Sequence, residues 1–81
     1  MWIITKDHVE SGRRVGVGPL DMRESHNGFH FRMYDDDGNL YYEGYSLCDS
    51  DFGPLDDFGQ PNAGATEIRY RNRKTGKYER L

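Results

Sequence analysis

Hydrophobic and polar residues alternate with a period of two in several short segments of the chain. In residues 29–34, phenylalanine and methionine at the odd positions alternate with more polar residues at the even ones. This is the pattern of a β-strand with one buried and one exposed face. Residues 66–71 alternate in the same way, and residues 1–5 are rich in β-branched and aromatic side chains. The pattern therefore predicts a chain built mainly from short strands.

A hairpin is predicted where an Asp-Asp-Asp-Gly-Asn sequence separates the first alternating run from a second one, because Asp-Gly is a frequent tight turn between strands. A two-residue turn at Asp-Gly would place Arg32 opposite Glu43. The same turn would place Tyr34 opposite Tyr41. A three-residue turn ending at the glycine would instead place Glu43 opposite Phe31. We favour the two-residue turn because it pairs opposite charges, and the three-residue turn stays open.

The segment of residues 48–64 is too long for an ordinary hairpin connection. It holds three glycines, two prolines and four aspartates, which favour bends. Phe52, Leu55 and Phe58 are the residues in it that would tuck against a sheet. We therefore expect one long, ordered, acidic loop.

Three weaker signals complete the pattern. Residues 15–18 alternate but contain two glycines, which weaken a strand. Residues 21–25 have room for one helical turn only. A three-residue turn ending at Gly76 would form a last hairpin, in which Arg71 faces Glu79.

Length and composition fit one small domain spanning residues 1–81. Leu, Ile, Val and Phe supply only 15 of the 81 residues, but 11 aromatic side chains can carry a compact core. We expect a mainly β fold, a small antiparallel sheet or barrel-like domain of about five or six short strands, with at most one or two short helical turns. A domain of this size buries only about 60% of the surface that its unfolded chain exposes, so a protein partner or a homodimer is expected.

The modest net charge of -3 hides a strong segregation of charge along the chain. Residues 1–34 carry five basic and four acidic side chains. Residues 35–67 carry nine acids and no lysine or arginine, whereas residues 69–81 carry six basic side chains and one acid. Such a chain can attract partners of either sign.

Motifs for catalysis or metal binding are weak in this sequence. A calcium loop centred on Gly38 would have Met33 and Gly44 at positions where carboxylates are needed. His26 and His30 have helical spacing, but His30 lies on a predicted strand. A chain of 81 residues also offers little volume for a water-excluding pocket. We therefore expect a protein that is not an enzyme and that uses no metal or cofactor.

Cysteine content and hydropathy indicate where the protein works. Cys48 is the only cysteine, whereas secreted domains of this size are usually stapled by several disulfides. The N-terminal apolar run covers only Trp2 to Ile4, which is far shorter than a signal-peptide core or a membrane span. We expect a cytoplasmic protein that does not enter a membrane.

The acidic stretch favours a non-catalytic protein-binding module. Carboxylates on a compact β scaffold can imitate the phosphates of nucleic acid and occupy a basic groove of a nucleic-acid-handling protein. A simpler interpretation is that the same aspartates suit turns and keep the surface soluble. The acidic partner-binding candidates are Asp35, Asp36, Asp37, Asp49, Asp51, Asp56 and Asp57. The aromatic anchor candidates are Tyr41, Tyr45, Phe52 and Phe58, because aromatic side chains dominate binding energy at interfaces.

The basic C-terminal segment supports an alternative function, direct binding of RNA or DNA. It interleaves cations with an aromatic residue, as a strand does when it tracks phosphates and stacks on bases. The candidate contacts are Arg69, Arg71, Arg73, Lys74 and Lys77. The preceding acids argue against this function, because they would repel nucleic acid if they lay nearby.

Three segments, residues 1–7, 35–44 and 51–64, resemble short uncharacterised bacterial proteins found in phage and mobile-element gene neighbourhoods. In size and acidity the chain is also similar to small inhibitors such as anti-CRISPR proteins. The resemblance implies an inhibitor that binds a protein partner. It carries no active-site residues to transfer.

Overall fold

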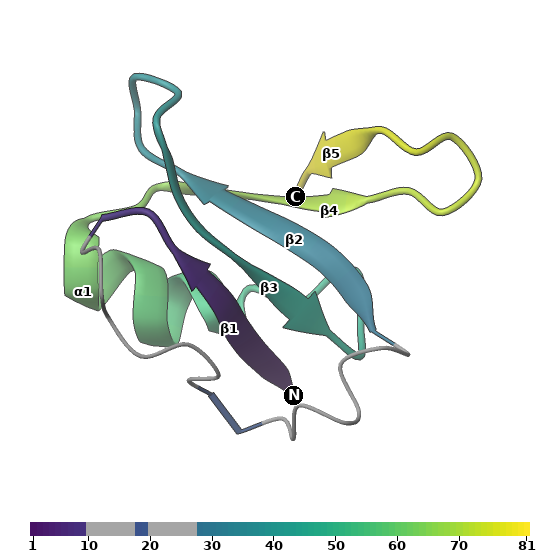
Figure 1. The fold of residues 1–81 in the computed structure, drawn as a ribbon, viewed down its shortest axis with the longest axis horizontal. Helices are drawn as coiled ribbons and strands as arrows, with labels where there is room; N and C mark the ends of the chain where they lie inside the picture. Colours follow the sequence, from purple (N-terminus) through teal and green to yellow (C-terminus); the bar gives the residue numbers. More distant parts are fainter. Residues whose placement is uncertain (10–17, 20–27) are drawn as a thin grey trace.

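The computed structural model describes residues 1–9, 18–19 and 28–81. Within these residues the chain forms one open antiparallel sheet, of strand order β1-β3-β2-β4-β5, with a helix packed on one side (Figure 1). The strands are β1 (Trp2–Asp7), β2 (Phe29–Tyr34), β3 (Leu40–Ser46), β4 (Glu67–Arg71) and β5 (Tyr78–Arg80). The prediction of a small, mainly β protein is confirmed, and the sheet is open rather than closed into a barrel.

Two of the weaker predictions concern parts of the chain that are not described. The helical turn expected at residues 21–25 lies outside the described residues, as does the strand expected at residues 15–18 except for its last glycine.

The turn between β2 and β3 has three residues, where two were favoured. The Asp35 N–H donates to the Asn39 carbonyl at 3.1 Å and so closes the turn. Gly38 ends the turn with a φ of 83°, a left-handed conformation that glycine adopts at little steric cost. The side chain of Asp35 strengthens the turn by accepting the backbone N–H of Asn39 at 2.8 Å. This Asx-type bonding explains why the longer turn forms.

The register of the β2–β3 hairpin nevertheless has the favoured charge pairing. Tyr34 lies opposite Leu40, and the register then shifts by one residue before Arg32 lies opposite Glu43. Such a shift is a β-bulge, in which one extra residue is inserted in one strand. The predicted pair of Arg32 and Glu43 is confirmed, whereas the predicted pairing of Tyr34 with Tyr41 is wrong.

The β4–β5 hairpin has a turn one residue longer than predicted. The carbonyl of Asn72 accepts the N–H of Gly76 at 2.7 Å, and the side-chain oxygen of Asn72 accepts a backbone N–H two residues further on at 2.8 Å. Gly76 has the expected left-handed φ, at 75°. Because of the extra residue, Arg71 lies opposite Tyr78, and the predicted pairing of Arg71 with Glu79 is wrong.

The long segment after β3 is ordered as predicted, but its centre is a helix and not a loop. A wide π-helical segment, η2 (Pro54–Gly59), continues directly into α1 (Gln60–Ala63). Pro54 stands in the first turn, where its missing N–H would have no partner within the helix. Gly64 ends the helix with a left-handed φ of 73°. Of the prolines and glycines that predicted bends, Pro54 and Gly64 therefore stand at the two ends of a helix, whereas Gly59 and Pro61 lie within it.

The core lies between this helix and one face of the sheet. Aromatic rings meet edge to face in it, with ring centroids 4.8 Å apart for Tyr42 and Phe58 and 5.7 Å apart for Phe31 and Tyr70. Its buried members are Ile4, Phe31, Met33, Tyr42, Leu55, Phe58, Ala65, Ile68 and Tyr70. Rings therefore supply much of the burial that the aliphatic-poor composition lacks.

Candidate functional site

The opposite side of the sheet, which faces away from the helix, is polar. Because side chains alternate along a strand, each strand that contributes to the core also sends residues to this side. The cross-strand pairing also places two apolar residues, Ile3 and Leu40, on this side, and Ile3 is fully buried. We call the polar residues on this side the open face: Lys6, His30, Arg32, Tyr34, Glu43, Tyr45, Glu67, Arg69, Arg71, Tyr78 and Arg80.

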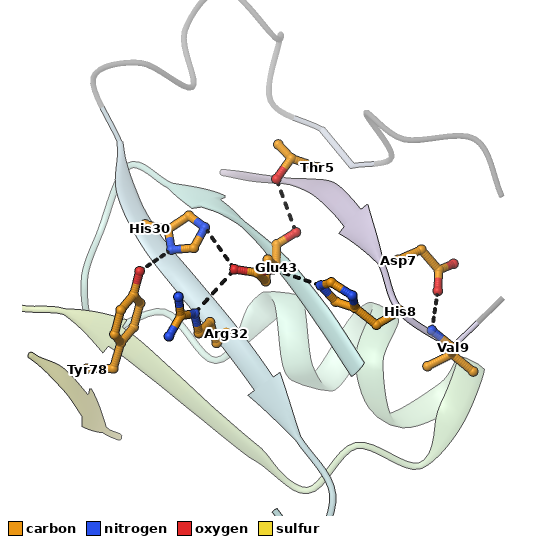
Figure 2. Close-up of polar contacts among 8 residues, drawn as sticks. All are labelled: Thr5, Asp7, His8, Val9, His30, Arg32, Glu43 and Tyr78. Atoms are coloured by element: carbon orange, nitrogen blue, oxygen red, sulfur yellow. Dashed lines mark hydrogen bonds and ion pairs between the residues drawn. The ribbon is translucent and has the colours of Figure 1, made fainter. Parts of the chain in front are cut away.

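Glu43, in strand β3 between β1 and β2, makes the most polar contacts on the open face (Figure 2). Its Oε2 accepts a hydrogen bond from Nε2 of His8 at 2.7 Å, and its Oε1 accepts one from Nε of Arg32 at 3.2 Å. His30 is the third side chain near this carboxylate, with its Nε2 3.6 Å from Oε1 of Glu43. Burial would raise the pKa of Glu43, but the bonds from His8 and Arg32 outweigh it and hold the pKa below the ordinary value of 4.5. Glu43 is therefore a carboxylate at neutral pH.

His30 links this carboxylate to the edge of the sheet. Its Nδ1 lies 2.6 Å from the hydroxyl of Tyr78 in β5, and its ring meets Tyr45 edge to face at 5.0 Å. The guanidinium of Arg32 covers the ring of Tyr78 at 4.0 Å. Burial and the neighbouring cations lower the pKa of His30 below 6.5, although the charge of Glu43 opposes them. His30 is therefore neutral at neutral pH.

Glu67 has a similar place between cations further along the sheet. Its carboxylate pairs with Nε of Arg69, and Nη1 of Arg80 lies 3.5 Å from it. Arg69 also covers the ring of Tyr34 at 4.6 Å. Each acid of the open face thus pairs with one arginine that also lies over a tyrosine ring.

The acids and cations of the open face lie at different depths. The side chains of Glu43 and Glu67 are only 8% and 13% exposed. Those of Arg32, Arg69 and Arg80 are 37%, 40% and 68% exposed. A ligand on this face therefore meets guanidinium groups first, with the neutralising carboxylates beneath them.

The net charge of the open face is opposite to that of the chain. Its lysine and four arginines against two glutamates give +3 when His30 is neutral, whereas the whole chain carries -3. Opposite signs on different surfaces orient a charged ligand as it approaches.

The seven aspartates predicted to bind a partner lie outside the open face. Asp35, Asp36 and Asp37 form the tip of the β2–β3 hairpin, and Asp49 and Asp51 follow the other end of β3. A strand of seven residues separates these two groups by about 20 Å. Asp56 and Asp57 are exposed in η2, on the helix side. The structure therefore does not gather the seven carboxylates in one cluster.

Three of these aspartates have structural partners. Asp35 holds its own turn, Asp36 accepts a hydrogen bond from the hydroxyl of Thr66 at 2.7 Å, and Asp51 accepts the N–H of Gly53 at the start of the helix at 2.7 Å. Turn bonding by Asp35 and Asp51, and the bond between the side chains of Asp36 and Thr66, explain the presence of these residues without a partner protein.

The four aromatic anchor candidates separate into exposed and buried groups. Phe52 is 46% exposed, contrary to the expectation that it tucks against the sheet. Phe58 is 3% exposed and packs in the core beside Trp2 and Tyr42. Its ring is therefore not available as a surface anchor. Tyr41 and Tyr45 are half-buried, and only Tyr45 belongs to the open face.

The five basic candidates are also separated. Arg69 and Arg71 belong to the open face. Arg73 instead covers the ring of Phe29 at 3.9 Å and donates to the backbone carbonyl of Gly28 at 2.9 Å. Lys74 and Lys77 are exposed in the β4–β5 turn.

Sequence reasoning missed the contributions of other strands to this face. Arg32, Tyr34, Tyr78 and Arg80 join Arg69 and Arg71 because β2 and β5 flank β4. The alternation in residues 29–34 already placed Arg32 and Tyr34 on a polar face. Alternation does not predict the order of the strands in the sheet. This order places β4 beside β2, so the polar face continues from β2 onto β4.

Comparison of the chain with protein-family models, curated proteins and solved structures finds no match. In the part of the chain that the structure describes, no helix has the length and apolar character needed to cross a membrane. The same residues contain no group of three or more His, Cys, Asp or Glu side chains that could hold a metal ion. The fold and the site thus define a small β-sheet protein with one cationic, tyrosine-bearing open face.

Proposed function

We propose that the protein is a non-catalytic binding module whose open face binds single-stranded nucleic acid. The observation that carries this proposal is the difference in depth between exposed arginines and the carboxylates beneath them. Exposed cations attract phosphates, and their release of counterions supplies much of the affinity for nucleic acid.

Single strands fit this face better than duplexes. A sheet face offers a broad platform on which unpaired bases stack on aromatic rings or on guanidinium planes. Arginines lie over the rings of Tyr34 and Tyr78, and an unpaired base could continue each of these stacks. Reading a duplex would instead require an element that enters a groove.

The acidic stretch is no longer an argument against nucleic-acid binding. Its aspartates are close in sequence to the basic strand, but they lie at the hairpin tip, beyond the end of β3 and on the helix side. Their field disfavours nucleic acid on those surfaces and leaves the open face as the attractive one.

The test is binding of a labelled single-stranded oligonucleotide at two salt concentrations. We expect the logarithm of the affinity to fall with the logarithm of the salt concentration by about 0.7 per phosphate contacted. An Arg71→Ala, Arg80→Ala double variant should bind more weakly and show a shallower salt dependence. A Lys74→Ala, Lys77→Ala variant is the matched control, since it removes equal charge from the adjacent turn. Absence of binding, or a larger loss in the lysine variant, would contradict the proposal.

A second candidate function is binding of a protein partner through the aspartates, as an inhibitor that occupies a basic groove. It is favoured by the exposure of Asp56 and Asp57 on the helix and of Phe52 beside it. Capture from a nuclease-treated bacterial lysate tests it, with Asp56→Lys, Asp57→Lys as the variant that should lose the partner. Capture that is unchanged by this charge reversal would contradict it. For both functions we propose the cytoplasm as the place of action.

A further inference from the structure

We propose that His30 couples binding of single-stranded nucleic acid on the open face to the uptake of one proton, so that the face binds more tightly in mildly acidic solution. This inference rests on the proposed function and adds its regulation. It depends on the position of His30 and on two hydrogen-bonded states of its ring.

His30 lies near the middle of the open face and touches groups from the surrounding strands. Its side chain is 18% exposed, and it approaches both the carboxylate of Glu43 and the hydroxyl of Tyr78. The charged or titratable groups that face it are Lys6 from β1, Arg32 from β2, Glu43 and Tyr45 from β3, Arg71 from β4 and Tyr78 from β5. A change in the charge of His30 therefore acts at the centre of the phosphate-attracting surface.

In the neutral state, the neighbours of the ring fix which nitrogen carries the hydrogen. Nε2 faces Oε1 of Glu43 at 3.6 Å, and a carboxylate can only accept, so the hydrogen resides on Nε2. Nδ1 is then an acceptor, and the hydroxyl of Tyr78, at 2.6 Å, donates to it. The hydroxyl hydrogen of Tyr78 therefore points to Nδ1 of His30 and is not available to a ligand.

In the protonated state, the bond between the two side chains reverses. His30 takes a proton from solvent at Nδ1, which becomes a donor to the oxygen of Tyr78. The hydroxyl hydrogen of Tyr78 must then turn away from the imidazole, toward solvent or toward a phosphate oxygen. Protonation therefore adds one positive charge and releases one hydrogen-bond donor on the open face.

Nucleic acid shifts this equilibrium because it cancels the charges that disfavour protonation. In the free protein, burial and the cations Arg32, Lys6 and Arg71 keep the pKa of His30 below 6.5. Phosphates lying over these cations would offset their charge and raise the pKa in the complex. By linkage, a proton that binds more tightly in the complex makes the complex tighter at low pH. A rise of one pKa unit corresponds to about a tenfold change in affinity.

The experiment measures the dissociation constant of a labelled oligo-thymidine from about pH 8 to about pH 5.5 at constant ionic strength. Thymine keeps the same charge throughout this range. The wild-type dissociation constant should fall by about tenfold toward acid, and His30→Gln should remove this dependence. Tyr78→Phe should retain only part of it, because the proton still binds but no hydroxyl is released.

His8→Gln is the matched control. His8 also bonds to Glu43, at 2.7 Å, but it is 40% exposed and binds Glu43 through the oxygen that His30 does not face. This variant should keep most of the pH dependence.

The outcomes separate this inference from the proposed function. Binding that does not change with pH, or a full pH dependence in His30→Gln, overturns the inference and leaves the proposed function intact. Absence of binding at every pH overturns the proposed function, and the inference with it. If His30→Gln does not fold, NMR titration of His30 in the wild type decides, since its pKa must rise when oligo-thymidine is added and an unchanged pKa overturns the inference.

Discussion

The two faces of the sheet differ in what holds them together. On the core face, Phe31 and Tyr42 are fully buried and pack against rings of the helix and of neighbouring strands. On the open face, Arg32 of β2 donates a hydrogen bond to the buried carboxylate of Glu43 in β3, and His30 of β2 lies 3.6 Å from the same carboxylate. One alternating pattern of side chains therefore forms both the core and the candidate site. Substitutions on the core face should change stability, and those on the open face should mainly change binding.

The largest effect is expected at Phe58 of the core, and Phe52 is its control, because both phenylalanines stand in an Asp-Phe-Gly sequence. Phe58→Ala should lower the free energy of unfolding by about 4 kcal/mol, because it empties a space in the core. Phe52→Ala should change it by less than about 0.5 kcal/mol, since Phe52 is 46% exposed. Denaturant titration of the two variants measures both values. Equal destabilisation would contradict the assignment of Phe58 to the core and Phe52 to the surface.

An intermediate effect is expected at Glu43, where stability and binding should change in opposite directions. Glu43→Gln keeps the shape but removes the charge that Arg32 and His8 approach, so unfolding should become easier by about 1.5 kcal/mol. Removal of a negative charge from beneath the open face should also strengthen oligonucleotide binding. Glu67→Gln is the control, because its arginine partners are more exposed and the loss should stay under about 1 kcal/mol. Weaker oligonucleotide binding by both variants would contradict the expectation that the carboxylates oppose the binding of phosphates.

The smallest effect is a loss of stability in acid, to which two groups of the open face contribute. The pKa of His30 is below 6.5 in the folded protein, so the unfolded chain binds the proton first and stability falls as the pH drops below about 6.5. The pKa of Glu43 is also lowered, so a second loss begins as the pH falls through about 4.5. Denaturant midpoints measured across this range should show both losses, and His30→Gln should remove only the first. A denaturant midpoint that rises as the pH falls would contradict the lowered pKa values of His30 and Glu43.

Much of the fold could be predicted from the local alternation of hydrophobic and polar residues and from the turn sequences. Alternation placed Phe31 and Met33 on one side and Arg32 on the other, as the structure has them. The Asp-Gly turn was located correctly, but its length depends on a side-chain bond from Asp35 to the backbone of Asn39, which pattern alone does not contain. In the β4–β5 turn, the side chain of Asn72 likewise accepts a hydrogen bond from a backbone N–H, and this turn is also longer than predicted.

The site depends on long-range arrangement and was predicted only in part. Arg69 and Arg71 were expected to act together with Lys74, whereas the structure joins them to Arg32 and Arg80 across strand boundaries. The helix was missed because glycine and proline favour bends in isolation, and burial of Leu55 and Phe58 against the sheet overrides that local preference.

Binding of single-stranded nucleic acid to the open face can be mapped by following amide and side-chain NMR shifts while oligo-thymidine is added. We expect small shifts at Asp56 and Asp57 on the helix and the largest shifts on the open face, at Arg32, Tyr34, Arg69, Arg71 and Tyr78. Shifts confined to the helix and the aspartate-rich turns, or no shifts at all, would contradict this expectation.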